Sequence, residues 1–196
     1  MGETAYYYST NNPAERVTFE TALLTGMASN YGLYMIARKD IPVLSRGRIE
    51  AMKGMTYAGI AYEVLEPFLG REVPPARLRS LLDDAYDARK IPTLVQKVTG
   101  QTRIMWLTRG PTYSFKDYAA RFFGRMLDHF LGERGLRRVV IVATSGDTGG
   151  AVADALLGLK NIDNIVFYPR GSISEGQRRQ MTTLGDNVHA FEVNGD

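Results

Sequence analysis

Apolar residues in the second half of the chain form short β-branched runs that alternate with amphipathic segments. The strand-like runs cover 103–108, 138–143, 163–168 and 188–193, and apolar residues recur at helical spacing over 117–131, 148–159 and 174–184. Two of the strands, R-V-V-I-V-A and N-I-V-F-Y, are almost continuously apolar, as expected where helices cover both faces of a sheet. The alternation predicts an α/β fold with a parallel, three-layer αβα sheet that begins in residues 96–196.

Residues 1–95 show a different pattern, which predicts a smaller, mixed and mostly helical region. Strands are expected at Tyr6–Tyr8 and Gly32–Ile36, and Asn11-Asn12-Pro13 predicts a turn ahead of a helix at about 18–28. Three further helices are expected near 46–53, 57–68 and 75–88, the last beginning after Pro74. The change of pattern predicts a domain boundary between Ile91 and Gly100.

Composition narrows the range of functions. With 44% hydrophobic and 23% charged residues and a net charge of +3, the chain is an ordinary globular protein, and the scattered charge argues against nucleic acid as a partner. It has no cysteine and only two histidines, which lie far apart, so we expect no metal site. The N-terminus has neither the basic head nor the apolar core of a signal peptide, and no stretch is long enough to span a membrane. We therefore expect a cytoplasmic protein with no membrane partner.

Lys116 is the first candidate for chemistry. It follows L-T-R-G-P-T-Y-S-F and precedes the amphipathic run that begins at Tyr118, so it is expected where a loop enters a helix. The neighbouring Phe115 and the positive end of the helix dipole would both favour a neutral amine, which can form a Schiff base with an aldehyde such as pyridoxal phosphate. The alternative is a solvated lysine in the first turn of a surface helix, which describes most lysines.

A second candidate follows the strand 138–143, where Thr144-Ser145-Gly146-Asp147-Thr148-Gly149-Gly150 leads into a helix. A glycine-rich turn at the carboxyl end of a parallel strand presents backbone N–H groups and a helix N-terminus to an anion. The spacing matches neither the dinucleotide motif nor the P-loop. A simple N-cap loop is the alternative. Because strands 103–108 and 138–143 are predicted to share a sheet, Lys116 and this turn are expected to face each other at its carboxyl edge.

Three arginines and one tyrosine were considered for supporting roles. Arg121 and Arg125 in the predicted helix 117–131 are interpreted as surface or interface residues. Arg170 could contact a substrate phosphate or be a solvated loop residue, and Tyr113 could line the crevice or pack.

Together these motifs carry a family resemblance. G-P-T-Y-S-F-K-D, then T-S-G-D-T-G, then Y-P-R-G-S-I-S-E-G-Q with M-T-T-L-G resemble, in order and spacing, the threonine synthase family, whose members are pyridoxal-phosphate enzymes of the tryptophan synthase β-chain fold type (fold type II). The resemblance extends over about residues 18–196. It implies a lyase of threonine biosynthesis that converts O-phospho-L-homoserine and water to L-threonine and phosphate through a Schiff base with pyridoxal 5′-phosphate.

The resemblance also implies a role for each residue of the two motifs. Lys116, beside Phe115, matches the lysine that binds the cofactor, and Asp147 matches the residue next to the cofactor's 3′-oxygen. Thr144, Ser145, Gly146 and Thr148 match the loop that receives the substrate carboxylate. The chain matches only the N-terminal half of the family, without the loop for the cofactor phosphate, so we expect it not to turn over substrate by itself.

Two alternatives and one question stay open at this point. The protein could be another pyridoxal-phosphate-dependent amino-acid lyase, dehydratase or phospho-lyase. It could also be a non-catalytic α/β binding or assembly module. Whether it is a monomer or a homodimer is left open.

Overall fold

The computed structural model describes residues 6–69 and 71–195 and forms two compact units, one ending at Asp84 and the other beginning at Ala85. The first five residues, on which part of the signal-peptide argument rests, lie outside the described residues. The sequence-based domain limits, 1–95 and 96–196, stay a prediction.

The first unit contains a three-stranded antiparallel sheet with the order β2-β1-β3, formed by β1 Tyr7–Ser9, β2 Asn12–Val17 and β3 Tyr34–Ile36. The turn predicted at Asn11-Asn12-Pro13 is wrong in its extent, because Asn12 and Pro13 already belong to β2. β2 is an edge strand, where proline is tolerated because a missing N–H costs no ladder bond.

Helix α1, Phe19–Thr25, begins directly after β2. The Thr18 hydroxyl caps it by accepting from the Thr21 N–H, and the Glu72 carboxylate accepts from the N–H groups of Phe19 and Glu20 at 2.9 and 2.7 Å. A carboxylate at a helix N-terminus satisfies otherwise unpaired N–H groups and opposes the positive end of the dipole. Glu72 lies more than fifty positions further along the chain and thereby ties the start of α1 to a distant segment of the first unit.

Three further helices and a short 3-10 turn follow: η1 Arg38–Asp40, α2 Arg46–Ala51, α3 Tyr57–Leu69 and α4 Pro75–Ala85. The predicted helices are confirmed, with earlier ends for α2 and α4. In α4, Leu78 and Leu82 are fully buried and lie one turn apart on the same face. The Arg79 guanidinium on α4 stacks on the Tyr62 ring of α3 at 3.5 Å from its centroid.

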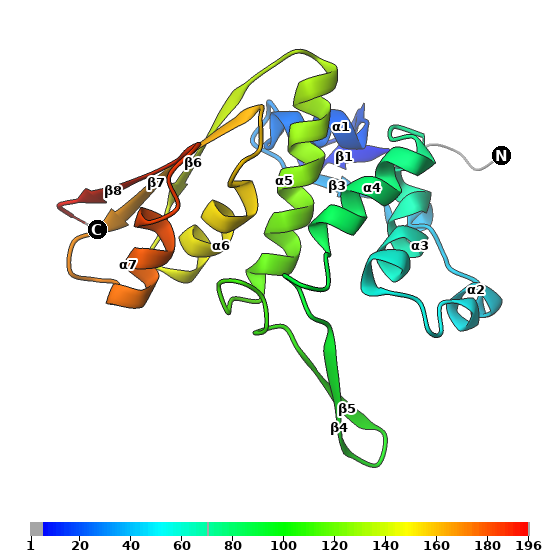
Figure 1. The fold of residues 1–196 in the computed structure, drawn as a ribbon. Coiled ribbons are helices and arrows are strands. Elements are labelled where there is room, and N and C mark those ends of the chain that lie inside the picture. Colours follow the sequence, from blue (N-terminus) through cyan, green and yellow to red (C-terminus); the bar gives the residue numbers. More distant parts are fainter. Residues whose placement is uncertain (1–5, 70, 196) are drawn as a thin grey trace. The chain divides into compact units, whose positions relative to one another are not determined.

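The second unit begins with a β-hairpin that corrects one prediction. β4, Leu94–Thr99, and β5, Thr102–Trp106, pair with each other antiparallel, and neither joins the parallel sheet (Figure 1). The strand expected at 103–108 in that sheet is therefore wrong in its pairing. The run 94–99 gives it a partner that is closer in the sequence, across the turn at Gly100, which has φ = 49°.

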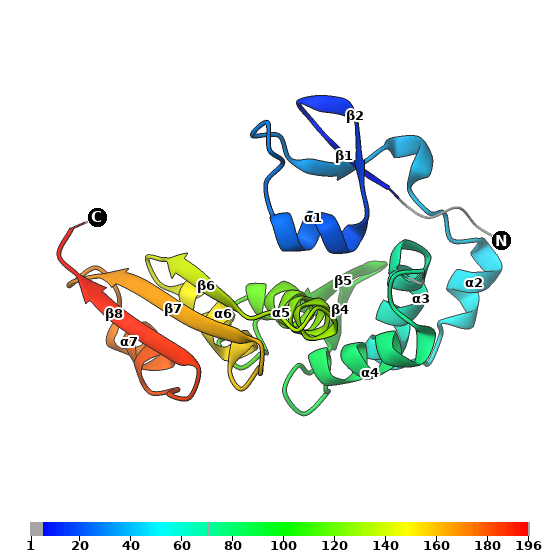
Figure 2. The ribbon, with the colours of Figure 1, turned by 90° about the horizontal axis from the view of Figure 1, so that it is seen from above.

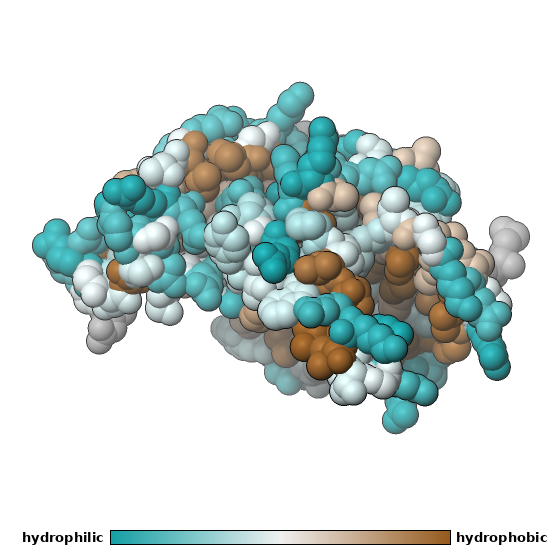
Figure 3. Space-filling model, turned by 60° about the horizontal axis from the view of Figure 1, so that its bottom comes forward, coloured by the Kyte–Doolittle hydropathy of each residue, from teal (hydrophilic) through white to brown (hydrophobic). Residues whose placement is uncertain are grey.

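The hairpin exposes apolar side chains on its surface. Val95, Val98, Ile104 and Met105 are all exposed. Figure 3 brings this end of the molecule forward and shows apolar patches beside strongly hydrophilic side chains. Neither strand of this hairpin buries one of its faces within the described part of the chain.

Beyond the hairpin, strands and helices alternate as predicted. The strands are β6 Arg138–Ala143, β7 Ile162–Pro169 and β8 Val188–Val193, and the helices are α5 Lys116–Glu133, α6 Asp147–Leu156 and α7 Glu175–Thr182. The sheet is parallel in the order β6-β7-β8, with Ile141 opposite Ile165 and Phe167 opposite Phe191. The predicted α/β class with a parallel sheet is confirmed.

Helices α6 and α7 lie on one face of this sheet (Figures 1 and 2). The core between them contains Ala153 of α6, Met181 of α7, Val166 of β7 and Val188 of β8. Side chains on the other face are more exposed, with 64% of Ile141 accessible. The alternation along β7, buried then half-buried at each step, follows from the two-residue period of a strand.

Arg121 and Arg125 are buried between α5 and α6, with exposed fractions of 2% and 7%, so their interpretation as surface residues is wrong. Gly124 lets the helices approach, because a Cβ there would lie 2.8 Å from the Leu156 side chain. The Arg125 guanidinium donates to the Ala155 carbonyl, which lies near the end of α6 and attracts positive charge.

Arg121 contacts both a backbone carbonyl and a carboxylate. It donates to the Ala85 carbonyl at 2.8 Å and forms an ion pair with Asp154 at 3.3 Å. Burial raises the pKa of the Asp154 carboxyl, and the charge of Arg121 opposes that rise. These arginines were missed as core residues because their burial depends on a helix pair that the sequence does not reveal.

None of the helices within residues 6–69 and 71–195 is long and apolar enough to cross a membrane. The same residues contain no group of three or more acidic or histidine side chains that could hold a metal ion.

Candidate functional site

Lys116 is the first residue of α5, as predicted, and its side chain is half-buried. Its ammonium lies 4.6 Å from the centre of the Phe115 ring, which is 61% exposed. The apolar surroundings expected for this amine are thus an exposed aromatic face and not a buried pocket. An amine in this place can be reached from solvent.

The loop before Lys116 is shaped by Asp117, whose side chain is 1% exposed. Its carboxylate folds back over the loop and accepts from the Thr112 N–H at 3.0 Å and from the Thr112 hydroxyl. Gly110 passes so close that a Cβ on it would lie 2.3 Å from an Asp117 carboxylate oxygen. The loop therefore depends on a glycine at 110 and an acceptor at 117, both within a few residues of the lysine.

Two more residues of this loop have unusual environments. Tyr113 has φ = 61°, in the left-handed region that tyrosine rarely adopts, and 73% of it is exposed. It does not pack, contrary to one of its two interpretations. Ser114 is buried, and its hydroxyl accepts from the Lys116 N–H at 3.3 Å. Backbone strain of this kind often accompanies a functional site.

The second turn is built around the Thr144 hydroxyl. Its oxygen accepts from the N–H groups of Gly146 and Gly149 at 3.1 and 3.0 Å and so closes the loop onto the first turn of α6. The N-cap residue Gly146 has φ = 144° and offers no side chain to do this. Thr144 is therefore the residue that builds the turn, with its oxygen already accepting two hydrogen bonds.

Ser145, Asp147 and Thr148 are exposed at this turn. In the described part of the chain, the N–H groups of these three residues have no acceptor, unlike those of Gly146 and Gly149. Free N–H groups in the first turn of a helix, beside two exposed hydroxyls, form a site suited to a carboxylate or a phosphate. The N-cap alternative, with Ser145, Asp147 or Thr148 as the cap, does not hold, because the N-cap residue is Gly146.

The two turns were expected to meet at the edge of one sheet, but β5 is not part of the parallel sheet. Helix α7 connects them instead. Gln177 donates from Nε2 to the Asp147 carboxylate at 2.8 Å, and Gln180, one turn later, donates to the Thr112 carbonyl at 3.4 Å. A Cβ on Gly150 would lie 3.0 Å from Gln180 as well. The loop before Lys116 and the 144–149 turn are thus both tied to α7, and not to the shared sheet edge that the sequence suggested.

Gln177 and Gln180 were not singled out from the sequence. The signal for the first was present, because S-E-G-Q has the spacing of a capping box. That capping box is formed: Ser174 accepts from the Gln177 N–H, and Gln177 accepts from the Ser174 N–H. Arg170, the candidate for a phosphate contact, is exposed at the end of β7 and pairs with Glu192.

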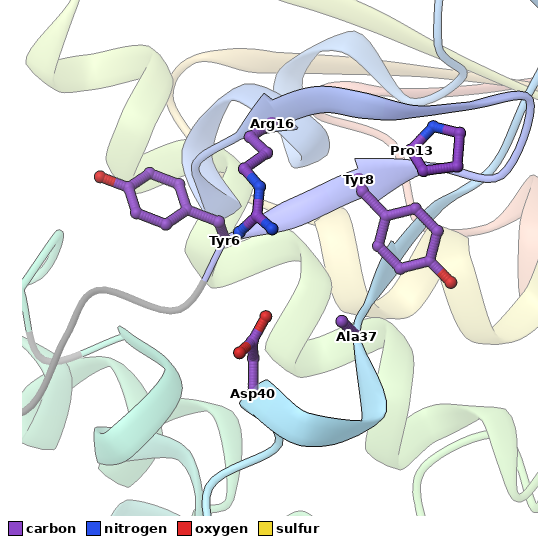
Figure 4. A pocket seen from close by; sticks show the side chains of 6 residues that line it. All are labelled: Tyr6, Tyr8, Pro13, Arg16, Ala37 and Asp40. Atoms are coloured by element: carbon purple, nitrogen blue, oxygen red, sulfur yellow. The ribbon is translucent and has the colours of Figure 1, made fainter.

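A separate hollow of about 300 Å³ lies in the first unit (Figure 4). It is lined by Tyr6, Tyr8, Pro13, Arg16, Ala37 and Asp40. Arg16 and Asp40 point toward each other across it from β2 and η1. None of the residues of the two turns belongs to this hollow.

Taken together, the second unit defines an α/β protein in which a glycine-rich turn and the loop before a lysine at a helix N-terminus are both tied to one helix. Comparisons with known proteins show what this chain is similar to. A family model described as threonine synthase N terminus matches residues 6–86. The threonine synthase of Pseudomonas aeruginosa is 37% identical over 193 residues, which are 97% of this chain and 41% of that protein.

Solved structures agree. A structure of pyridoxal-phosphate-bound threonine synthase from Brucella melitensis is similar with a TM-score of 0.91 and 35% identity over 98% of this chain and 42% of that one. Threonine synthase from yeast is similar with a TM-score of 0.87 and 32% identity over 98% of this chain and 41% of that one. The predicted resemblance to the N-terminal part of the threonine synthase family is confirmed, and the chain spans about two fifths of the length of these relatives.

Proposed function

We propose that the protein is a threonine synthase that converts O-phospho-L-homoserine and water to L-threonine and phosphate, and that this chain supplies the lysine that binds pyridoxal 5′-phosphate. The observation that carries the proposal is the joint attachment of the Lys116 loop and the 144–149 turn to α7 through Gln180 and Gln177. The similarity to a pyridoxal-phosphate-bound threonine synthase over 98% of the chain supports it.

The residues present fit such a cofactor. Lys116 offers a half-buried amine at a helix N-terminus, next to an exposed aromatic ring. Asp147 offers an exposed carboxylate in the first turn of α6, which we assign to the side of the cofactor that carries the 3′-oxygen. Lys116 would hold the group covalently through its amine, with Phe115 beside it.

When bound, pyridoxal phosphate supplies an electron-withdrawing ring, which makes the α-proton of an attached amino acid removable. The Lys116 amine, once released by the substrate's amine, would remove that proton and return protons during the later steps. Water is added at the β-carbon in the overall reaction, after the γ-phosphate has left.

We assign binding of the substrate carboxylate to the second turn. The free N–H groups of 145, 147 and 148 and the hydroxyls of Ser145 and Thr148 can donate to it, while Thr144 and Gly146 set the shape of the turn. A carboxylate fixed here orients the α C–H bond relative to the Lys116 amine. Orientation of this kind contributes to the rate without any change in the reacting groups.

Covalent trapping at Lys116 tests the proposal. The chain is incubated with pyridoxal 5′-phosphate, reduced with borohydride and mapped by mass spectrometry, alongside Lys116→Ala and the exposed control Lys160→Ala. We expect labelling at Lys116 in the unsubstituted chain and in Lys160→Ala, and none at that peptide in Lys116→Ala. Scattered labelling, or labelling that is unchanged in Lys116→Ala, would remove the proposal and favour a non-catalytic α/β module.

A further inference from the structure

Gln177 performs two tasks with the two ends of one side-chain amide. Its oxygen accepts from the Ser174 N–H at 3.0 Å and completes the capping box of α7. Its nitrogen donates to the Asp147 carboxylate at 2.8 Å, thirty residues earlier in the chain. Because an amide has a distinct acceptor and donor, these two tasks can be separated by substitution.

Asp147 has no other side-chain partner in residues 6–69 and 71–195. The N-cap Gly146 contributes no side chain, and the Thr144 hydroxyl is used by the N–H groups of Gly146 and Gly149. The approach of Gln177 is also close: a Cβ on Gly146 would lie 2.5 Å from its nitrogen. The glycine therefore makes room for the glutamine, and the glutamine is what fixes the direction of the carboxylate.

We propose that Gln177 is a positioning residue, whose side-chain N–H holds the Asp147 carboxylate in the orientation that pyridoxal phosphate at Lys116 requires. This inference rests on the proposed function. Gln180 complements it from the next turn of α7 by contacting the carbonyl of Thr112, in the loop that presents Lys116. One helix thereby places the carboxylate relative to the lysine.

Gln177→Glu separates positioning from helix capping. The glutamate keeps an oxygen for the Ser174 N–H, since glutamate and glutamine both complete a capping box. It loses the donor to Asp147 and places a like charge against it. In the Asp147→Asn background the same glutamate can accept from the asparagine amide, so the hydrogen bond is restored with its direction reversed and with the net charge of the original pair.

The measurement is the pyridoxal 5′-phosphate concentration that gives half-maximal borohydride-trapped labelling of Lys116. We expect Gln177→Glu to raise it about tenfold, the order expected for one lost hydrogen bond to a charged group. In the Asp147→Asn background we expect the same substitution to change it less than about threefold. The control Thr18→Ala removes the N-cap hydroxyl of α1 in the first unit and should lower the thermal midpoint while leaving the half-maximal concentration unchanged.

Equal effects of Gln177→Glu in both backgrounds, or no effect in either, would overturn the positioning role. A failure of the proposed function looks different, because Lys116 would then not be labelled in the unsubstituted chain. In that case the Gln177 side-chain amide signals in ¹⁵N NMR show whether Gln177 contacts Asp147. Slow hydrogen exchange that is lost in Asp147→Ala supports the Gln177–Asp147 contact, and fast exchange in the unsubstituted chain contradicts it.

Discussion

The two turns of the candidate site each place an aspartate in the first turn of a helix, yet they are held in opposite ways. Asp117 is buried and folds back on its own loop, where Thr112 is its partner. Asp147 is exposed, and its partner Gln177 lies on another helix. The loop of Lys116 is thus built largely by nearby residues, whereas the geometry of the 144–149 turn depends on α7.

The difference matters for how the site can fail. A change in α7 should disturb Asp147 and the 144–149 turn while most of the contacts around Lys116 persist. A change at Asp117 should disturb the lysine loop and leave the other turn intact. The four predictions below test this division, each through stability or local dynamics.

Asp117→Ala is expected to have the largest effect. It removes a buried carboxylate that accepts two hydrogen bonds and leaves the Thr112 N–H without its acceptor. We expect a loss of about 3 kcal/mol in the free energy of unfolding, measured by chemical denaturation. Asp163, which is half-buried and paired with the exposed Arg137, is the control, and Asp163→Ala should cost less than about 1 kcal/mol.

The local character of the Asp117 contacts is read from NMR. Backbone shifts in Asp117→Ala should concentrate in residues 110–118. Shifts of equal size at Gly146 and Asp147 would contradict the division, because they would mean that the two turns are coupled without α7.

Gly146→Ala tests the 144–149 turn, which depends on α7, as Asp117→Ala tests the Lys116 loop. Alanine would have to adopt φ = 144°, and its Cβ would meet Gln177 at 2.5 Å. We expect a loss of about 2 kcal/mol. The control is Gly47→Ala in α2, where a Cβ meets nothing within 4 Å and a better helix former should be neutral or stabilising.

Thr144→Val is a smaller change in the same turn. Valine keeps the shape of threonine and removes the oxygen that accepts from Gly146 and Gly149. We expect a loss of about 1 kcal/mol and faster hydrogen exchange at those two N–H groups. Thr148→Val, at an exposed residue whose hydroxyl has no partner in the described residues, is the control and should leave both exchange rates unchanged.

The fold was largely predictable because its signals are local. β6 and β8 begin and end where their β-branched runs do, and α5 begins at the lysine that was expected to open it. The second hairpin strand, β5, was assigned to the wrong sheet because a β-rich run identifies a strand but not its partner. Here the partner is the neighbouring run 94–99.

The site was predictable in its residues but not in its connections. Lys116 and the 144–149 turn could be named from composition and helix-start signals. The contact of Gln177 with Asp147 joins residues thirty positions apart, and the burial of Arg121 depends on how closely α6 approaches α5. Neither distance is encoded in a local pattern, so side-chain positioning and buried charge required the structure.

Glu175→Gln is expected to have the smallest effect and bears directly on α7. Glu175 pairs with Arg178 and Arg179 in the first turns of this helix, and both guanidinium groups lower its pKa to about 2. Because the folded-state pKa lies below the ordinary value of 4.5, the stabilisation is present above about pH 4.5 and is lost as the pH falls toward 2. At pH 7 we expect the substitution to lower the thermal midpoint by only about 1 °C, since the pair is exposed.

Over the same pH range, the two turns should differ in their hydrogen-exchange rates. As Glu175 is protonated, the start of α7 loosens, and with it the hold of Gln177 on Asp147. After correction for the intrinsic rate, hydrogen exchange at Gly146 and Gly149 should therefore accelerate as the pH falls from 5 to 2. It should do so at a higher pH than exchange at Thr112. Glu175→Gln should show the faster exchange at Gly146 and Gly149 already at pH 7. Asp87→Asn is the matched control, because Arg89 lowers the pKa of Asp87 to about 2 as well, but at a residue that contacts neither turn. Simultaneous loosening of both turns would mean that α7 holds the Lys116 loop as firmly as it holds Asp147, and that the Asp117 contacts do not suffice on their own.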